Sequence, residues 1–512
     1  CYCEYCRRRF RKASGLEIPV SQSAPEWKPY VSWLMDAFKE LRRDICDCIH
    51  QYRPEMVVSF NWVYTMRQPE IVPPGVGSLM ADIFPDDQVF NASYQARHWI
   101  STGIPFDIMN TAFLRWWGDW GCKPAIAMKQ EVATTLANGG LTWIGYQMDH
   151  SFDVEPAVMN ELQEVMTFIK EREHLYSDNR PIRCIGVLNS TTSHDSTGKI
   201  WLDESGFQGL HRILLEGGFY HQFVDEVTLQ DHLSDYQAVI LTDQMYLSPE
   251  LIQALKLWVE DGGILIVEGL TGTLSSGFKD NKELQFTDLL GVRYEGIHEE
   301  SHAYVVALEP SIKKNTLDMP HLLEGEVLFV RPEPNVEVLA RFYRPYLRGD
   351  GEYLLRRSPK GPNSGYPAIT RRRSGSGTVV YLAGQFFRAY QLQQQWNLKN
   401  LFINLLNDLL PARAAKCSSS SLVEMVPMKQ GDAYVIHLVN YGSLYPVGNR
   451  RNVASERIIP ARDTVIELRT GRPPQAVTWE PFGLKLDHSY ENGVTTIQVP
   501  EVEIHGALVV KT

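Results

Sequence analysis

Apolar residues along the first third of the chain follow two alternating patterns, and this alternation constrains the fold more than any other feature. Between Trp33 and His50 they recur every three or four positions, as on one face of an amphipathic helix. An apolar run at 56–60 predicts a buried strand. Further strands are predicted near 78–84, 106–111 and 141–147, and further helices near 92–101 and 125–137. Strands that alternate with helices are typical of a parallel sheet with crossover helices.

The four predicted strands amount to half of a (β/α)8 barrel, since a complete barrel takes about 250 residues. A long helix predicted over 156–176 closes the unit, and Asp178-Asn179-Arg180-Pro181 is expected to be a linker. We therefore assign residues 1–178 to a partial (β/α)8 barrel, its C-terminal half.

The alternation resumes at Ile182 and predicts a second α/β domain over residues 179–412. Its strands are expected over 182–188, 238–242, 264–268 and 379–383, and its helices over 210–216 and 249–261. This pattern is typical of a doubly wound, flavodoxin-like domain. A segment rich in Pro and Arg, near 294–376, interrupts the pattern and is expected to be an excursion that could make subunit contacts.

The last hundred residues, 413–512, are expected to form a small all-β sandwich. Alternating apolar residues at 434–438 and 495–499 predict strands there. The chain contains no internal repeat. Its 512 residues, 44% hydrophobic and 22% charged, are too many for one core, which agrees with several domains.

Composition excludes some classes of partner. The net charge is −11, and the basic runs at 7–9 and 371–373 are short and lack interleaved aromatic residues, so nucleic acid is not expected as a partner. No stretch approaches the roughly 18 apolar residues of a membrane span. Eight cysteines are too sparse for a disulfide scaffold, which favours a cytoplasmic location. The chain starts at Cys1 within a motif, so a missing front part is expected and export stays open.

Polar and aromatic residues gather after the predicted barrel strands, where barrel enzymes place their chemistry. Indole rings beside carboxylates suit a sugar, because a pyranose face stacks on the ring while its hydroxyls bind polar groups. Some of these tryptophans could instead belong to the core or to a domain interface. The candidate substrate-binding residues are Asn61, Trp62, Asn110, Arg115, Trp116, Trp117 and Gln147.

Glycosidic bond hydrolysis usually needs two carboxyl groups, roughly 5 Å apart for retention and roughly 6.5–9.5 Å apart for inversion. Asp82, at a predicted strand end, is the first catalytic candidate, Asp119 the second and Glu70 the third. Each could instead be a surface cap or a residue that hydrogen-bonds the substrate. No cofactor is expected to be required for catalysis.

Three cysteines near the start, Cys1, Cys3 and Cys6, have metal-like spacing and predict a structural zinc site whose fourth ligand would lie upstream. The alternative is a cysteine-bearing loop without metal. Cys184 lies within a predicted strand and is expected to be buried and inert. The turn after the strand at 238–242, where an amidotransferase nucleophile would sit, contains no cysteine, so that activity is excluded.

Several segments resemble known glycoside hydrolases. Residues 1–10, Cys-Tyr-Cys-Glu-Tyr-Cys-Arg-Arg-Arg-Phe, resemble the cysteine segment after the fourth barrel strand of family 42 glycoside hydrolases and of related hydrolases near the family 29 α-L-fucosidases. Residues 136–140 and 117–121 resemble later barrel segments of these groups. Residues 262–269, 289–293 and 377–381 resemble the β-galactosidase trimerisation domain, an amidotransferase-like module without catalysis.

The resemblance implies a retaining exo-glycosidase, fucosidase-like or galactosidase-like, that acts on a carbohydrate. It also implies a homo-oligomer, for which a trimer is possible. Two departures qualify this. Asn110 stands where family 42 has its nucleophilic Glu, and the nucleophilic Asp of the fucosidases would fall before Cys1. The hypothesis is therefore an upstream nucleophile with Asp82 or Asp119 as acid/base, so that the 512 residues alone would be inactive. The alternative is a non-catalytic carbohydrate-binding or assembly protein on the same scaffold.

Overall fold

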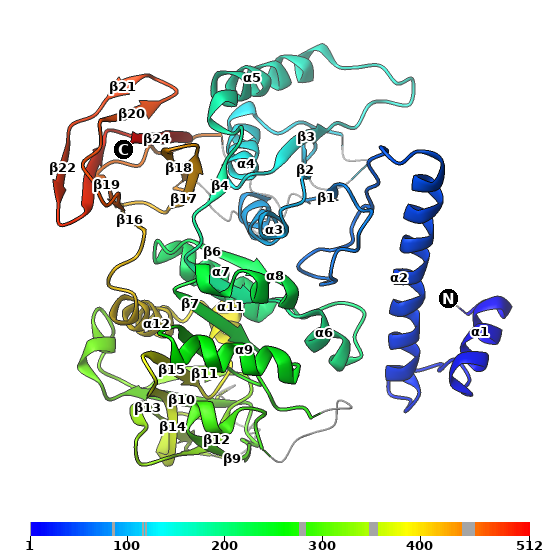
Figure 1. The fold of residues 1–512 in the computed structure, drawn as a ribbon, viewed down its shortest axis with the longest axis vertical. Helices are drawn as coiled ribbons and strands as arrows, with labels where there is room; N and C mark the ends of the chain where they lie inside the picture. Colours follow the sequence, from blue (N-terminus) through cyan, green and yellow to red (C-terminus); the bar gives the residue numbers. More distant parts are fainter. Residues whose placement is uncertain are drawn as a thin grey trace.

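A computed structural model describes residues 2–83, 88–114, 117, 120–275, 283–347, 357–442 and 456–512. Figure 1 shows four parts: a pair of N-terminal helices, a small parallel sheet with its helices, a large doubly wound domain and a C-terminal β domain. The prediction of a mixed α/β chain with several sheets is confirmed at this coarse level. None of the described helices combines the length and the apolar character that a membrane crossing requires.

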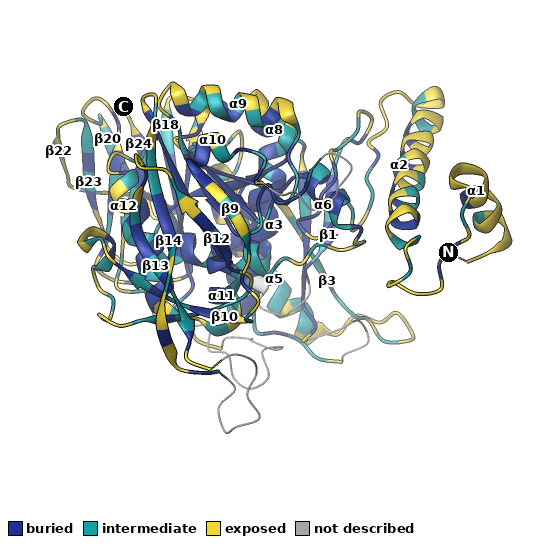
Figure 2. Cartoon of the chain, turned by 90° about the horizontal axis from the view of Figure 1, so that it is seen from below, coloured by how far each residue is buried: buried dark blue, intermediate teal, exposed yellow. Residues whose placement is uncertain are grey.

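The N-terminal helices α1 (Glu4–Ser14) and α2 (Trp27–Tyr52) project from the rest of the chain (Figure 1). They pack on each other through Phe10 and Tyr30, whose rings meet edge to face at 5.4 Å. Most of their surface is exposed (Figure 2). The exposed part includes Phe38 and Leu41, which belong to the predicted apolar face of α2. The helix was thus predicted correctly, but the described residues leave part of its apolar face uncovered.

A three-stranded parallel sheet stands where the partial barrel was predicted. It consists of β1 (Leu79–Asp82), β2 (Phe106–Thr111) and β3 (Leu141–Gly145), with α3 (Gln88–Thr102), α4 (Ala125–Ala137) and α5 (Pro156–Arg172). The strand predicted at 56–60 is not regular: only one bridge, from Asn61 to Met80, joins this segment to β1. The described residues contain no closed barrel.

The two faces of this sheet differ in burial because side chains alternate along a strand. Leu79, Ala81 and Ile108 belong to one buried cluster with Trp99 of α3, so this face is covered by helices. On β3 the other face carries Leu141, which is 64% exposed, and Trp143, which is 40% exposed. The sheet therefore presents an open, partly apolar face opposite its helices.

The doubly wound domain is built on a nine-stranded sheet. Five strands are parallel and lie in the order β6-β5-β7-β8-β15, and four antiparallel strands, β14, β13, β10 and β11, extend the β15 edge. The parallel strands are β5 (Ile185–Leu188), β6 (His221–Val224), β7 (Ala238–Thr242), β8 (Ile264–Glu268) and β15 (Gly377–Leu382). The antiparallel strands are β10 (His302–Ala307), β11 (His321–Glu324), β13 (Glu337–Pro345) and β14 (Lys360–Ser374). The predicted excursion is thus part of the sheet.

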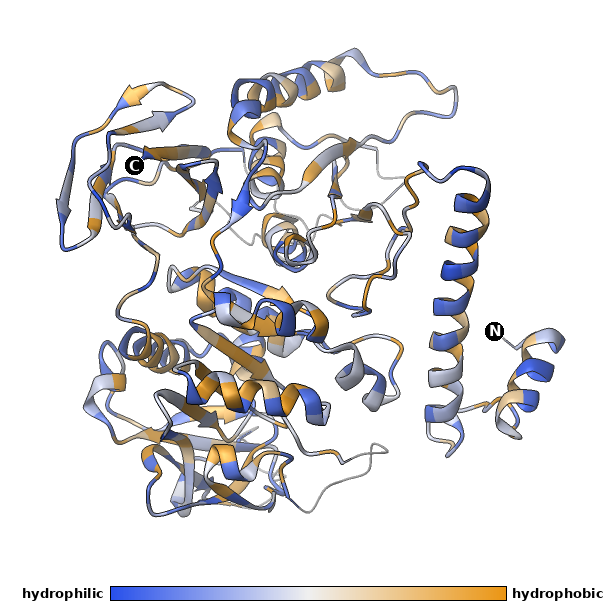
Figure 3. Cartoon of the chain, in the orientation of Figure 1, coloured by the Kyte–Doolittle hydropathy of each residue, from blue (hydrophilic) through white to orange (hydrophobic). Residues whose placement is uncertain are grey.

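Helices cover this sheet, and β9 (Val292–Ile297) pairs with β12 (Leu328–Pro332) beside it. Hydrophobic residues dominate the central strands (Figure 3), which are buried along their whole length except at the first residue of β8. The helices are α6 (Thr191–Thr197), α7 (Ser205–Glu216), α8 (Glu226–Asp231), α9 (Pro249–Glu260), α10 (Thr287–Leu290), α11 (Phe386–Gln393) and α12 (Trp396–Leu409). Short 3-10 turns lie at 173–175, 233–235 and 310–313.

Two antiparallel sheets make up the C-terminal β domain and share a hydrophobic core that includes Met425, Ile466 and Trp479. One sheet has the order β16-β19-β23-β22 and the other β21-β20-β24-β18-β17-β4. The first contains β16 (Ala415–Ser418), β19 (Thr464–Arg469), β22 (His488–Glu491) and β23 (Val494–Val499). The second contains β4 (Arg180–Pro181), β17 (Val423–Gln430), β18 (Ala433–Asn440), β20 (Ala476–Glu480), β21 (Leu484–Lys485) and β24 (His505–Lys511).

The expectation of a linker at 178–181 was wrong in part, because Arg180 and Pro181 form the edge strand β4 and pair with Lys429 and Met428 of β17. A proline, which lacks an N–H group, is tolerated at the edge of a sheet. The segment that leads into the second domain is therefore held by the third.

A buried ion pair lies where the three larger parts meet. Arg97 of α3 donates to Glu424 of β17 at 2.7 Å (Nη2 to Oε1), and each side chain is only 1% exposed. The Glu424 carboxylate also accepts hydrogen bonds from Ser93 at 2.6 Å, from Asn138 at 3.0 Å and from Tyr441 at 2.6 Å. Hydrogen bonds from four side chains thus offset the free-energy cost of burying this carboxyl group.

The same arginine reaches the doubly wound domain. Arg97 Nη1 lies 3.0 Å from His221 Nδ1 at the start of β6 and donates to the carbonyl oxygen of His221 at 3.3 Å. His221 Nε2 in turn lies 2.8 Å from Nδ1 of His211 on α7. Burial and the nearby Arg97 hold the pKa of His221 well below its usual range, so the imidazole is neutral. One cation thus connects α3, β6 and β17.

Removing the charge of Glu424 should destabilise the whole assembly. In Glu424→Gln the buried Arg97 guanidinium loses its counter-charge, and we expect a loss of about 3 kcal/mol or more in the free energy of unfolding. Denaturant-induced unfolding followed by tryptophan fluorescence measures it. The control is Glu40→Gln, which removes the exposed ion pair to Arg9 and should cost less than about 1 kcal/mol. Equal effects of the two variants would contradict the role given to the network.

A second buried histidine pair should make stability depend on pH. Nδ1 of His437 lies 3.1 Å from Nε2 of His505, and burial lowers the pKa of His437 to about 3. In the unfolded chain the pKa is near the ordinary value of 6.5, so the unfolded state binds protons first as the pH falls. Stability is therefore complete above pH 6.5 and decreases from there towards pH 3, by up to about 1.4 kcal/mol per pH unit for each histidine.

Melting temperatures at pH 7, 6 and 5 test this dependence. In His437→Gln the decrease with falling pH should be smaller than in the wild type, whereas the exposed His488→Gln should follow the wild type. An unchanged slope in His437→Gln would show that this pair does not control the acid sensitivity.

Candidate active site

Asp82, the last residue of β1, lies at the carboxyl end of the parallel sheet. Its register partner on β2 is Met109, and alternation from the helix-facing Ala81 turns its side chain to the open face. Burial raises the pKa of Asp82, and hydrogen bonds from the side chains of Trp62 and Asn61 oppose this by lowering it. Asp82 is thus a half-buried carboxyl with a raised pKa, held by two polar neighbours.

Asn61 and Trp62 reach Asp82 through the segment that bridges to β1. Asn61 pairs with Met80, and the backbone N–H of Trp62 donates to the carbonyl oxygen of Met80 at 3.3 Å. Trp62 has φ 65°, a left-handed conformation that costs free energy for a bulky residue and is found mainly at functional positions and turns. The indole is 36% exposed beside Asp82. Three residues predicted from two separate strand ends therefore lie together.

Asp107 is a second carboxyl on the open face, and sequence reasoning did not single it out. Trp143 of β3 donates from its indole Nε1 to Asp107 Oδ1 at 2.7 Å. Burial raises the pKa of Asp107, and the bond from Trp143 opposes this. Asp107 precedes Met109, the register partner of Asp82, by two residues, so the two Cα atoms lie roughly 8 Å apart. The signal in the sequence was a carboxylate alternating with Phe106 and Ile108 within an apolar strand.

Trp117 lies over the end of β3. A Cβ atom on Gly145 would come within 2.7 Å of Met109 Sδ and 3.2 Å of the Trp117 ring, so only glycine leaves room for this contact. The ring of Phe113 supports Trp117 at 4.7 Å, and Trp117 remains 48% exposed. Gln147, two residues beyond Gly145, is half-exposed and donates to the carbonyl oxygen of Met148 at 3.1 Å.

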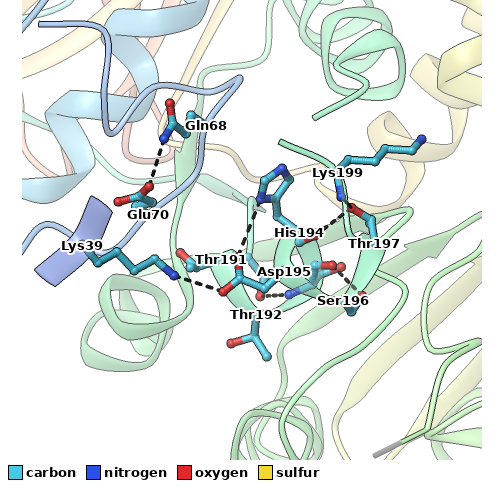
Figure 4. Close-up of polar contacts among 12 residues, drawn as sticks. Lys39, Gln68, Glu70, Thr191, Thr192, His194, Asp195, Ser196, Thr197 and Lys199 are labelled. Atoms are coloured by element: carbon cyan, nitrogen blue, oxygen red, sulfur yellow. Dashed lines mark hydrogen bonds and ion pairs between the residues drawn. The ribbon is translucent and has the colours of Figure 1, made fainter. Parts of the chain in front are cut away.

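Two other candidates lie apart from this group. Asn110 is fully buried and donates from Nδ2 to Thr142 Oγ1 at 2.6 Å, and strand alternation places it on the face opposite Met109. Glu70 is buried in an ion pair with Arg42 and accepts from Gln68 Nε2 at 3.0 Å (Figure 4). Glu70 thus has a structural role in its loop.

Four candidate residues lie outside the described residues: Cys1, Arg115, Trp116 and Asp119. Cys3 is exposed and caps the start of α1, where hydrogen bonds from Cys6 lower its pKa. Among the residues that the structure describes, no three His, Cys, Asp or Glu side chains are arranged to hold a metal ion, so zinc binding by Cys1, Cys3 and Cys6 stays a prediction.

Burial raises the pKa of Cys184 to about 11, which makes it a poor nucleophile at neutral pH.

Comparison with solved structures identifies the fold. The α-L-fucosidase isoenzyme 2 from Paenibacillus thiaminolyticus matches all of this chain and 75% of its own, with a TM-score of 0.81 and 20% identity. Two β-galactosidases, from Rahnella sp. R3 and Bacillus circulans sp. alkalophilus, match all of this chain and 76% and 77% of theirs, with TM-scores of 0.69 and 0.68 and identities of 16% and 14%. These likenesses show a glycoside hydrolase-like fold.

The sequence comparisons give no family. No family model matches the chain, and no curated protein matches it.

The two indole–carboxylate pairs allow a matched test of the site. Trp62→Phe removes an N–H donor to the carboxylate form of Asp82, so the pKa of Asp82 should rise. Trp143→Phe should raise the pKa of Asp107 and leave that of Asp82 unchanged, since its indole bonds to Asp107. Titration of ¹³C-labelled aspartate carboxyl carbons by NMR, with Asp82→Asn and Asp107→Asn for assignment, measures both. An unshifted Asp82 in Trp62→Phe would contradict the arrangement.

Proposed function

We propose that the protein is a glycoside hydrolase that acts at the open face of the parallel sheet, with Asp82 as its acid/base. The observation that carries this proposal is a half-buried carboxyl of raised pKa, at the carboxyl end of a parallel strand and flanked by an exposed indole. A raised pKa increases the fraction of the carboxyl group that is protonated at a given pH, and only the protonated form can give its proton to a leaving oxygen. The proposal is also supported by the glycoside hydrolase-like fold, because barrel enzymes have their chemistry at the carboxyl ends of the strands.

Each residue of the site has a proposed role. Asp82 protonates the glycosidic oxygen as the sugar leaves, and then takes a proton from the water that attacks the anomeric carbon. Trp62 and Trp117 offer indole faces to the apolar side of the sugar ring, and Asn61 and Gln147 offer hydrogen bonds to its hydroxyls. Arg115, Trp116 and Asp119 are proposed to join them from the loop after β2, with Asp119 as the second candidate for acid/base. A retaining, fucosidase-like or galactosidase-like reaction on a terminal sugar follows from the resemblance of the sequence.

The second carboxyl group is proposed to come from residues before Cys1. Asn110, at the end of β2, has no carboxylate and is buried on the other face. About a quarter of the fucosidase chain has no counterpart here. The uncovered apolar residues of β3 and α2 fit the surface against which further barrel strands would pack. The 512 residues alone should therefore not cleave glycosides.

The remaining domains have supporting roles in this proposal. The order β6-β5-β7-β8-β15 is that of flavodoxin-like sheets and supports a trimerisation-like domain over 179–412, and the two sheets of the C-terminal part support a β-sandwich over 413–512. This domain is proposed to make the protein a homo-oligomer, of which a trimer is one possible form. Cys1, Cys3 and Cys6 could bind a structural zinc ion, which the reaction does not need.

A second candidate function, carbohydrate binding without catalysis, is favoured by one observation. Asn110 stands in place of a carboxylate, and its amide is already engaged with Thr142. In that case the full-length polypeptide binds sugars but cleaves none of a broad panel of aryl glycosides.

Asp82→Asn in the full-length polypeptide tests the catalytic proposal. An amide cannot donate the proton, so kcat/KM for glycosides with poor leaving groups should fall by about 10²–10⁴-fold. Substrates with a 2,4-dinitrophenyl leaving group need less protonation and should lose less. Asp107→Asn is the matched control, because Asp107 is also half-buried and bonded to an indole, and its loss should be less than tenfold in the same assay. An equal loss on both kinds of substrate would argue against Asp82 as the acid.

A further inference from the structure

A cavity of about 40 Å³ lies in the doubly wound domain, at the carboxyl ends of β5 and β7. The proposed glycosidase site does not use it. In the sheet order, β5 stands between β6 and β7, so that the chain leaves β5 in one direction and later returns on its other side. Open α/β sheets bind ligands in the crevice outside the strand ends at such a reversal.

His194 of α6 lines the cavity and is only 2% exposed. Neither of its ring nitrogens has a hydrogen-bond partner among the residues that the structure describes. The charged group beside it is Asp195, whose Oδ1 lies 3.9 Å from His194 Nδ1, beyond hydrogen-bond distance (Figure 4). Buried polar groups are almost always paired, since an unpaired one loses its hydration without compensation. This imidazole is therefore suited to a partner inside the cavity.

The imidazole is neutral. Burial lowers the pKa of His194 to about 4, and the nearby cations Lys39 and Lys199 contribute to this. Lys39 is held by Asp195 at 3.1 Å (Nζ to Oδ2), so its charge is fixed beside the ring. A neutral imidazole offers one N–H donor and one acceptor nitrogen. It can both give a hydrogen bond to a ligand and receive one.

Asp243, at the end of β7, forms another wall of the cavity. Its φ of 49° is left-handed, and non-glycine residues in this region are concentrated at functional positions. The carboxylate accepts the backbone N–H of Leu270 at 2.9 Å and the amide of Gln385 at 2.8 Å. Each oxygen still has a lone pair that can accept a further hydrogen bond.

The lining determines which ligand chemistry is acceptable. It contains Asp203 and Asp243 and no lysine or arginine side chain, so no cation faces the cavity to pair with an anion. Asp203 is already bonded to Ser205 and Arg388, and no metal-binding trio occurs among the described residues, which disfavours a metal ion. Leu202 and Phe207 add apolar surface. A neutral ligand with hydroxyl groups on a carbon framework matches this combination.

We propose that this cavity binds vicinal hydroxyl groups of a small neutral molecule, with His194 and Asp243 as their hydrogen-bonding partners. Its volume of 40 Å³ has room for about three water-sized groups. That corresponds to a glycerol-sized unit, which could be a free polyol or the diol edge of a sugar ring.

Gly206 of α7 allows a variant that narrows the cavity without removing a polar group. A Cβ atom there would lie 3.3 Å from Thr242 Oγ1 and 3.7 Å from Asp243 Oδ2, which are tight but tolerable contacts. Alanine also favours the helical conformation more than glycine does, so Gly206→Ala should fold at least as well as the wild type. His194→Leu removes the imidazole, and His232→Leu changes a partly exposed histidine of the same domain as its control.

Saturation-transfer difference NMR on the full chain, with glycerol, erythritol, L-fucose and D-galactose as separate probes, tests the proposal. We expect signals from at least one probe, and a fall of about tenfold in its affinity in Gly206→Ala and in His194→Leu, as for the loss of one good hydrogen bond. His232→Leu should bind like the wild type. Trp62→Ala should also retain binding, which separates this cavity from the proposed glycosidase site.

The outcomes are distinct. Signals from glycerol or erythritol identify a free polyol as the ligand class, and signals from the sugars alone identify a sugar edge; both support the proposal. No signal from any probe, or equal signals from Gly206→Ala and the wild type, would overturn it. If His194→Leu does not fold, Gly206→Ala and His232→Leu decide alone.

Discussion

The buried carboxylate of Glu424 is the interaction on which the arrangement of the domains depends. It belongs to β17 of the β domain, yet its hydrogen-bond partners come from α3, from the residue after α4 and from the loop after β18. A buried ion pair contributes little net stability when it is complete, but loss of one member leaves an uncompensated charge. The network therefore mainly fixes how the domains are arranged. All the hydrogen bonds to Glu424 can form only when α3, the residue after α4 and the β domain lie in one relative position.

This condition extends to the candidate active site. α3 carries Arg97 and Ser93 on the side that meets Glu424, and Trp99 and Ala96 on the side that packs against β1 and β2. The helix that anchors the domains is thus the same helix that supports the strand ending at Asp82. The open face of the sheet is free for a ligand because every fixed contact of this helix lies on the other face.

How much could be predicted from sequence depended on whether a segment is buried on all sides. The limits of β2, β7, β8 and α4 were predicted without error, because the turn residues on both sides of a continuous apolar run mark where the strand or helix begins and ends. β6 was missed because His221 and Gln222 interrupt its apolar pattern; both are buried and paired, His221 with Arg97 and Gln222 with Tyr236. The segment at 56–60 has an apolar run but forms no regular strand, because among the described residues it lacks a strand partner on one side. A local sequence pattern does not show whether such a partner is present.

The site was predictable to the same extent. The rule that barrel chemistry lies at strand ends found Asp82, Asn61 and Trp62, which do lie together. The same rule misplaced Asn110, because alternation along β2 turns it towards Thr142. It also passed over Asp107, since this residue lies inside the strand and its role depends on Trp143 from the neighbouring strand. Contacts across strands come from register, which sequence alone does not fix.

Two sets of parallel strands in this chain end in acidic residues, and their surroundings give them different chemistry. Asp82 lies on the open face of its sheet, where its half-buried carboxyl stands beside the exposed indole of Trp62. Asp243 faces a cavity in which Gln385 and Leu270 already donate hydrogen bonds to its carboxyl group. A parallel sheet places its strand ends on one edge wherever it occurs. Each carboxyl has two donors from the protein, so the two edges differ in what else lies beside the carboxyl: an exposed indole at Asp82 and the buried imidazole of His194 at Asp243.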